Sequence, residues 1–226
     1  MSRLTFILNG LQTARSFIAY CVILLLITIS TKTLAQHKGF TVIGNLSEFK
    51  KKFSEEGKKV QSIRSSFVQE KNLALLEEKI ISNGKFWFQR EKKVRIEYQR
   101  PFRYLMIING DQILIRDDQK ESKISTHSNK LFQQINRIIV DCVNGAIIDN
   151  KDFVSKIFQN EKTYLLEMTP TTKSIKEFFQ KIIVLVNKKD WTVMSIQLVE
   201  PGGDDTFIRF SDKALNEKID ETLFVR

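Results

Sequence analysis

Short runs of alternating apolar and polar residues fill most of the chain from residue 65 to residue 211. In one of them, Val94, Ile96 and Tyr98 alternate with Arg95 and Glu97, so an extended strand here has one apolar and one charged face. Only a few turn residues separate successive runs. Parallel strands need a crossover of about a dozen residues, so strands joined this closely must be antiparallel. The pattern predicts about ten strands in a single antiparallel sheet.

Asparagine-containing turns predict three hairpins along these runs. The turns are Asn83-Gly84 within residues 79–89, Asn109-Gly110-Asp111 between residues 103–108 and 112–116, and Asn160-Glu161 between residues 153–158 and 163–169. Residues 120–126 read as a polar edge strand, and residues 179–186, 192–199 and 206–211 read as three further strands. The strands therefore follow one another as a meander.

Two segments depart from this period of two. Apolar residues at Leu46, Phe49, Phe53, Val60 and Ile63 recur at mostly helical intervals, and either Asn45 or Ser47 can cap the helix. A second helical pattern runs from Leu131 to Val143 and stops near Gly145. The apolar faces of these helices need a partner, and the apolar face of the sheet is available. The sequence predicts a mainly β (α+β) fold, in which one strongly curved antiparallel sheet carries the helices on its concave side.

Residues 1–35 read as a signal peptide rather than as part of the folded domain. Basic residues come first, an apolar run from Ile18 to Ile29 follows, and small or polar residues lead to Ala35, after which cleavage is expected. The alternative is an uncleaved anchor, which needs roughly 20 apolar residues and therefore a longer run. A lipid-anchored precursor is not expected, because Cys21 lies inside the apolar run. The predicted mature protein is a single domain of residues 36–226.

Charge and cysteine content restrict the possible partners and chemistry. The net charge is +10, but the basic residues are spread along the chain, which favours a solvated surface over a nucleic-acid interface. Cys142 is the only cysteine after residue 35, so no disulfide within the domain is expected. In its apolar helical segment, Cys142 is expected to be a small buried hydrophobe.

The residues that enzymes usually need are not brought together by any pattern. After residue 35 the only histidines are His37 and His127, and neither belongs to a motif for nucleophilic catalysis or zinc binding. The adjacent pairs Asp117-Asp118 and Asp204-Asp205 would point to opposite faces of a strand. We expect no enzyme activity, no metal and no cofactor. The 17 phenylalanines either fill the core or line an apolar ligand pocket, and the pattern leaves both interpretations open.

Three stretches resemble the periplasmic outer-membrane lipoprotein carrier proteins (the LolA-like family). They are Ser66-Phe67-Val68-Gln69; Gly84-Lys85-Phe86-Trp87-Phe88-Gln89-Arg90, continuing through Val94, Ile96, Tyr98 and Pro101 to Asn109-Gly110-Asp111-Gln112; and the positions of Phe179, Met194, Phe210-Ser211 and Leu223-Phe224. Together they span nearly all of residues 36–226. The sequence departs from the family at Glu91, where a proline is usual, and at Val94 and Ile96, where aromatics are usual.

The resemblance implies an unclosed β-barrel with helices as a lid over a cavity for the acyl chains of lipoproteins. It implies a monomeric periplasmic carrier that receives lipid-modified proteins from an inner-membrane transporter and passes them to an outer-membrane acceptor. Alternatives of other classes are an envelope-stress sensor or interaction subunit with the same cavity, and a secreted enzyme.

Six residues are predicted to form the site. By strand parity, the five residues expected to contact the acyl chain lie on the concave face: Phe86, Phe88, Val94, Ile96 and Tyr98. The side chains of Lys85, Arg95 and Glu97 then face water. Arg90 continues the parity of Phe86 and Phe88. If it points inward, carbonyl groups at the ends of the lid helices can accept its hydrogen bonds, and the matching family arginine is a latch on the lid. If the strand ends earlier, its guanidinium is solvated.

Overall fold

The computed structural model describes residues 37–76, 78–90, 92–125 and 130–225, except for the side chains of residues 130–136. The chain divides into two units, residues 1–38 and 39–226, and the fold described below is that of the second. The signal-peptide prediction lies outside the described residues. The sheet consists of β1 (Thr41–Val42), β2 (Ser62–Leu73), β3 (Glu78–Gln89), β4 (Lys93–Arg100), β5 (Tyr104–Asn109), β6 (Gln112–Asp117), β7 (Glu121–Ser125), β8 (Phe153–Gln159), β9 (Thr163–Pro170), β10 (Lys181–Asn187), β11 (Val193–Val199) and β12 (Asp205–Leu215).

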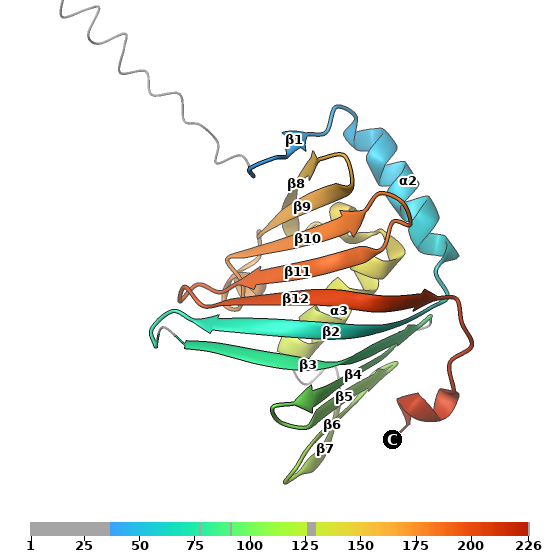
Figure 1. Ribbon diagram of the computed structural model, residues 1–226, viewed down its shortest axis with the longest axis vertical. Coiled ribbons are helices and arrows are strands. Elements are labelled where there is room, and N and C mark those ends of the chain that lie inside the picture. The colour runs from blue at the N-terminus through green and yellow to red at the C-terminus, as the bar shows by residue number, and fades with distance from the viewer. Residues whose placement is uncertain (1–36, 77, 91, 126–129, 226) are drawn as a thin grey trace, which may run out of the picture. The chain divides into compact units, whose positions relative to one another are not determined.

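Within the described part of the chain, these twelve strands form one antiparallel sheet in the order β1-β8-β9-β10-β11-β12-β2-β3-β4-β5-β6-β7 (Figure 1). Strands β2–β7 and β8–β12 are two meanders, and the pairing of β12 with β2 joins them at the middle of the sheet. The terminal strands β1 and β7 are not paired with each other, so the barrel stays open. The predicted single antiparallel sheet is confirmed, including the position of residues 121–125 at its edge.

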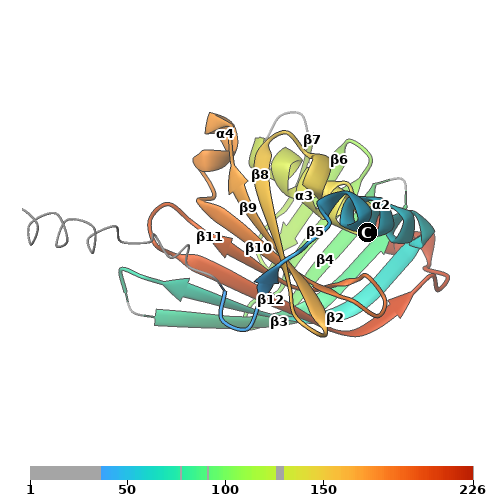
Figure 2. The same cartoon turned by 90° about the horizontal axis from the view of Figure 1, so that it is seen from above.

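Two long helices lie on the concave side of the sheet (Figures 1 and 2). Helix α2 (Leu46–Lys59) begins at Asn45, whose side-chain oxygen accepts a hydrogen bond from the Glu48 amide at 3.0 Å. Its buried residues are Phe49, Phe53 and Gly57, whereas the side chain of Leu46 is 45% exposed. The helix ends before Val60 and Ile63, so the predicted helical pattern extends too far: Ile63 belongs to β2.

Helix α3 (Lys130–Asn144) has the expected extent and ends at Gly145, which has a positive φ of 70°. A positive φ is readily adopted only by glycine, which explains this residue at the end of the helix. In the described part of the chain, the remaining helices are short: η2 (Ile147–Asp149), α4 (Lys173–Lys176) and η3 (Glu221–Phe224). Residues 173–176, which lie between two of the expected strands, form a turn of helix that buries Ile175.

The core on the concave side consists of two clusters, and α3 contributes to both. Phe49 and Phe53 of α2 pack in a cluster with strands of the β8–β11 meander, including Leu166, Ile182 and Val184. Ile138 and Cys142 of α3 belong to the same cluster. Other side chains of α3, Ile139, Val140 and Val143, pack against a second cluster on β2–β6, which includes Phe67, Phe86, Phe88, Val94 and Ile108. Helix α3 therefore spans both clusters, whereas α2 contributes to the first.

The Asn83-Gly84 pair is not a turn, and this prediction is wrong. Strand β3 runs without interruption from Glu78 to Gln89 and pairs with β2 along its whole length. A Cβ atom on Gly84 would lie 2.1 Å from the carbonyl oxygen of Glu97 and 2.7 Å from the Phe67 ring. Glycine is required at this position because β4 and a phenylalanine ring approach the backbone closely, not because the chain reverses there.

The C-terminal segment covers part of the convex face. Phe224 of η3 is buried against Trp87, Leu105 and Ile107, which point away from the concave side. Arg95 donates a hydrogen bond to the Leu223 carbonyl at 2.9 Å and forms an ion pair with Glu97 at 2.6 Å. The predicted exposure therefore holds for Lys85 but not for Arg95, whose side chain is only 11% exposed.

Candidate ligand-binding cavity

A cavity of about 560 Å³ lies between the sheet and α3. This volume is within the range of about 300–1,000 Å³ that is typical of small-molecule sites. Alternating residues of β2, β3, β4, β11 and β12 form its floor, among them Ile63, Phe67, Ile196, Ile208 and Phe210. Helix α3 contributes Ile138, Ile139, Cys142 and Val143. The wall is mainly apolar, because the inward face of each strand is apolar and the helix presents its apolar side.

Three of the five predicted ligand-binding residues lie on the cavity wall. Phe86, Ile96 and Tyr98 line it. Phe88 and Val94 lie opposite each other on β3 and β4, point to the same side and are fully buried within the core. Strand parity thus gives the correct face for all five, but not which of them remain accessible from the cavity.

Most of the other lining residues were missed, although some had a sequence signal. Ile208 and Phe210 alternate within the predicted strand at residues 206–211, and Ile139, Cys142 and Val143 have helical spacing. No local sequence signal predicts that β12 pairs with β2. This pairing places Ile208 opposite Gln69 and Phe210 opposite Phe67. That long-range pairing brings the two meanders to one cavity.

The polar groups in the wall are few. The Tyr98 hydroxyl donates a hydrogen bond to the side-chain oxygen of Gln69 at 2.8 Å, and burial raises the pKa of Tyr98 to about 12. Lys71 and Glu200 form an ion pair at 3.2 Å. Burial, reinforced by Asp141, also raises the pKa of the Cys142 thiol to about 12, so Cys142 is neutral at physiological pH. A neutral thiol is a poor nucleophile, in keeping with the expected role of Cys142 as a buried hydrophobe.

Arg90 lies just beyond the end of β3 and contacts the end of α2. Its Nε donates to the carbonyl of Val60 at 2.7 Å and its Nη2 donates to the carbonyl of Gly57 at 2.8 Å. The last carbonyls of a helix have no partner within the helix, so a guanidinium there satisfies them and complements the helix dipole. Although the strand ends at Gln89, the guanidinium is thus held by the helix rather than only by solvent.

The end of α2 that Arg90 contacts is packed directly on the end of α3. A Cβ atom on Gly57 would lie 2.5 Å from the carbonyl carbon of Asn144, and one on Gly145 would lie 2.3 Å from the carbonyl oxygen of Phe53. Only glycines allow backbones to approach this closely. Arg90, α2 and the cavity-lining α3 therefore form one connected set of contacts.

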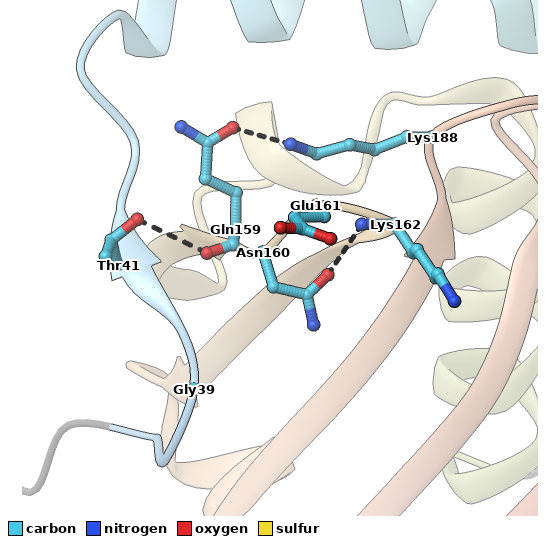
Figure 3. A pocket seen from close by; sticks show the side chains of 7 residues that line it. All are labelled: Gly39, Thr41, Gln159, Asn160, Glu161, Lys162 and Lys188. Carbon is cyan, nitrogen blue, oxygen red and sulfur yellow. Dashed lines mark hydrogen bonds between the residues drawn. The ribbon is translucent and has the colours of Figure 1, made fainter.

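A second depression lies at the edge of the sheet near β1 and β8, and it is polar (Figure 3). Its groups are already engaged in local structure: the Gln159 carbonyl accepts from Thr41 at 3.3 Å, the Gln159 side chain accepts from Lys188 at 2.9 Å, and Asn160 accepts from the Lys162 amide at 2.9 Å. These bonds hold β1 and the β8–β9 turn. The apolar cavity under α3 is therefore the candidate site.

Three of the four carboxylates in the adjacent pairs, Asp117, Asp204 and Asp205, form hydrogen bonds with neighbouring groups. Asp117 accepts hydrogen bonds from the amides of Gln119 and Lys120, which lower its pKa. Asp204 accepts from the Ala74 amide, and Asp205 accepts from the Asn72 side chain. In the described part of the chain, no three His, Cys, Asp or Glu side chains are grouped so that they could hold a metal ion. His127 lies outside the described residues. No helix among them is long and apolar enough to cross a membrane.

Several solved structures are similar to this chain. One is a LolA superfamily protein from Nitrosomonas europaea, which is 11% identical and has a TM-score of 0.41. The similarity covers 78% of this chain and 97% of that protein. A putative outer membrane lipoprotein-sorting protein domain from Vibrio parahaemolyticus has 12% identity, a TM-score of 0.44 and coverage of 78% and 94%. A chain in the structure of the Pseudomonas aeruginosa MucA/MucB complex is 11% identical to this chain, with a TM-score of 0.47. That similarity covers 78% of this chain and 59% of the other.

No curated protein sequence matches the chain. A family model does match: residues 58–226 fit the model described as outer membrane lipoprotein carrier protein LolA. The match covers the strands and the helix that build the cavity, from the C-terminal end of α2 to the segment over the convex face. The open antiparallel sheet with few helices agrees with it. The chain therefore belongs to the outer membrane lipoprotein carrier family.

Proposed function

We propose that the chain is a periplasmic carrier that holds the acyl chains of lipid-modified proteins in the cavity under α3 and takes them from the inner to the outer membrane. The observation that carries the proposal is the apolar cavity, with Phe86, Ile96 and Tyr98 on its wall. Each methylene buried there contributes about 0.8 kcal/mol, so a long acyl chain gains on the order of 10 kcal/mol before the cost of ordering it. Family membership supports the same role.

The proposal is tested by comparing a peptide that carries an acyl chain with the same peptide without it. Calorimetry should give a much tighter Kd for the acylated form. Ile96→Asn places an amide in the cavity wall and should weaken acyl binding by about tenfold, because burying an unpaired polar group costs about 1–3 kcal/mol. The matched control is Ile81→Asn, at a residue that is 58% exposed and outside the cavity. Equal binding of the two peptides by the wild-type protein would show that the cavity does not take up acyl chains.

Export is part of the proposal. We infer that residues 1–35 are removed and that the mature chain begins at Gln36. Intact-mass analysis of the periplasmic fraction should give the mass of residues 36–226. A full-length protein that stays with the membrane would exclude cleavage.

Two proposed partners are taken from the family: an inner-membrane lipoprotein-releasing transporter as donor and an outer-membrane acceptor. No nucleic-acid partner is proposed, because the basic residues are spread along the chain. Mass spectrometry of the protein purified from the periplasm should identify acylated proteins bound to a monomer. A single unlipidated partner would instead indicate a sensor subunit, and the carrier role would then be wrong.

A further inference from the structure

A β-bulge in β12 turns a lysine toward the cavity. Ser211 pairs with Ser66 and Ala214 pairs with Arg64, so β12 has one more residue than β2 between these two pairs. Asp212 has a positive φ of 51° within the bulge. Before it, the even-numbered Ile208 and Phe210 line the cavity, and after it Lys213 does. In a regular strand Lys213 would share the opposite face with Arg209 and Ser211, and redirecting a side chain is a common role of bulges near functional sites.

Lys213 is half-buried and has only neutral direct partners. Its Nζ donates a hydrogen bond to the Thr192 hydroxyl. It also donates to the Val193 carbonyl, at a distance of 3.5 Å. Within the described residues, no carboxylate forms an ion pair with it. Asp190 accepts a hydrogen bond from the Thr192 hydroxyl at 2.7 Å and interacts electrostatically with Lys213 without forming an ion pair, and Asp212 accepts from Ser211 at 3.2 Å. Burial lowers the pKa of Lys213, while Asp190 opposes this shift. Among the described residues, this partly desolvated ammonium at an apolar cavity therefore has no carboxylate in direct contact, although Asp190 is near enough to act on it.

Ser65 adds a second polar group on the same part of the wall. It lies on β2 between the two residues that flank the bulge in register, Arg64 and Ser66, so it faces Asp212 and Lys213 across the strand pair. Its side chain lines the cavity and is only 3% exposed. Among the described residues, its hydroxyl has no hydrogen-bond partner. Buried hydroxyl groups without a partner are unusual, and a ligand that supplies an acceptor would satisfy this one.

The cavity wall has a second lysine, Lys71, but its charge is neutralised by an ion pair. Lys71 forms an ion pair with Glu200 and lies seven residues further along β2 than Arg64, roughly 23 Å at about 3.3 Å per residue. The cavity thus has an apolar wall between two polar ends, of which only the Lys213 end has a cation without an ion pair in the described residues. An elongated ligand with one anionic end would place that end at Lys213.

We propose that Lys213 and Ser65 bind the anionic head group of an amphiphile, a carboxylate or a phosphate monoester, whose hydrocarbon chain occupies the cavity. This proposal rests on the proposed function of the cavity and extends it to a second class of ligand. An ester- or amide-linked acyl chain has no anion at its head, so the Lys213 end would distinguish free fatty acids or lipid phosphates from the acyl groups of a lipoprotein.

The test uses laurate, dodecyl phosphate and dodecanol, which have hydrocarbon chains of similar length and differ mainly in the head group. Each displaces the neutral fluorescent probe N-phenyl-1-naphthylamine from the full chain at pH 7. At least one of the two anions should bind about tenfold more tightly than dodecanol, which corresponds to about 1.4 kcal/mol. The preferred anion identifies the head group as carboxylate or phosphate.

Four variants assign the preference to the two residues. Lys213→Met should abolish the preference for the anion, measured as the ratio of anion affinity to dodecanol affinity in the same variant, and Lys213→Arg should keep it. Ser65→Ala should reduce it in part. Lys85→Met removes the same charge from an exposed position outside the cavity and should leave it unchanged.

The outcomes separate this proposal from the one on which it rests. If dodecanol binds as well as both anions, or if Lys213→Met keeps the preference, the anion site is wrong and the cavity function stands. If none of the three compounds displaces the probe, both proposals fail.

Discussion

The Arg90 guanidinium connects the end of β3 to the two helices over the concave face. It bonds to carbonyls at the end of α2, and Gly57 in that same turn packs on Asn144 and Gly145 at the end of α3. Hydrogen bonds of a charged group contribute about 1.5–3 kcal/mol when buried, and less in this half-buried position. If the proposed carrier function requires α2 and α3 to separate when cargo enters, a contact of this strength opposes that separation without preventing it.

Arg90→Leu should therefore change cargo release. Under the proposed carrier function, the variant loses contacts that hold α2 in place when no cargo is bound, so the equilibrium shifts toward the cargo-bound state. Acylated cargo should be held more firmly and should pass more slowly to an acceptor membrane or protein. The free energy of unfolding should fall by about 1–2 kcal/mol.

A transfer assay with labelled acylated cargo measures this effect, and Arg103→Leu is the control. Arg103 is exposed on the connection between β4 and β5, so its replacement removes the same charge away from the helices. Wild-type transfer by the Arg90 variant, with the fold intact, would remove Arg90 from the mechanism.

At the scale of the element, β3 depends on the close approach at Gly84. The register of β3 and β4 shifts between Asn83 and Gly84, and the Glu97 carbonyl and the Phe67 ring fill the space that a side chain would need. The strand can therefore pass between β2 and β4 here only with a glycine.

Gly84→Ala should lower the free energy of unfolding by about 3 kcal/mol, because the new methyl group overlaps a backbone oxygen that cannot move without breaking the sheet. Urea denaturation measures the loss. Gly44→Ala is the matched control, since a Cβ atom at Gly44 meets nothing within 4 Å. Similar stability of the two variants would contradict this account of β3.

Elements with local signals could be predicted from the sequence. The cap at Asn45, the turn at residues 109–111 and the glycine after α3 each have a short-range physical cause. The prediction of a turn at Asn83-Gly84 was wrong because a glycine at this position can also serve a close approach between strands. The cover over Trp87 was missed because Phe224 reaches it from a distant part of the sequence.

The candidate site divides in the same way. Parity places Phe86, Ile96 and Tyr98 on the cavity face, but the depth of Phe88 and Val94 depends on how the sheet curves. Lys213 could not be placed, because the expected strand ended at Ser211, just before the bulge that reverses parity.

At the scale of the whole molecule, the sheet is covered on both faces. The two long helices lie on the concave face, while η3 and the residues before it cover Trp87, Leu105 and Leu114 on the convex face. Phe224 is the large apolar side chain at the centre of this cover, and the Leu223 carbonyl accepts the hydrogen bond of Arg95.

Phe224→Ala should therefore destabilise the protein by about 3–5 kcal/mol, the usual cost of truncating a buried aromatic residue. It should also increase quenching of tryptophan fluorescence by acrylamide, because Trp87 loses its cover. Val225→Ala is the control, at an exposed neighbouring position. A Phe224 variant as stable as this control would mean that the C-terminal segment contributes little to the fold.

The pairing of β12 with β2 has a consequence for the order in which the chain can fold. Each meander consists of local hairpins, but the middle of the sheet forms only when residues 205–215 meet residues 62–73. Until β12 has been synthesised, β2 has an open edge, and such edges invite pairing with other chains. Contacts this distant in sequence also form slowly. Purified chains that end before Asp205 should thus stay sensitive to protease, whereas chains that include Leu215 should become resistant, and resistance of the shorter chains would show that the first meander folds alone.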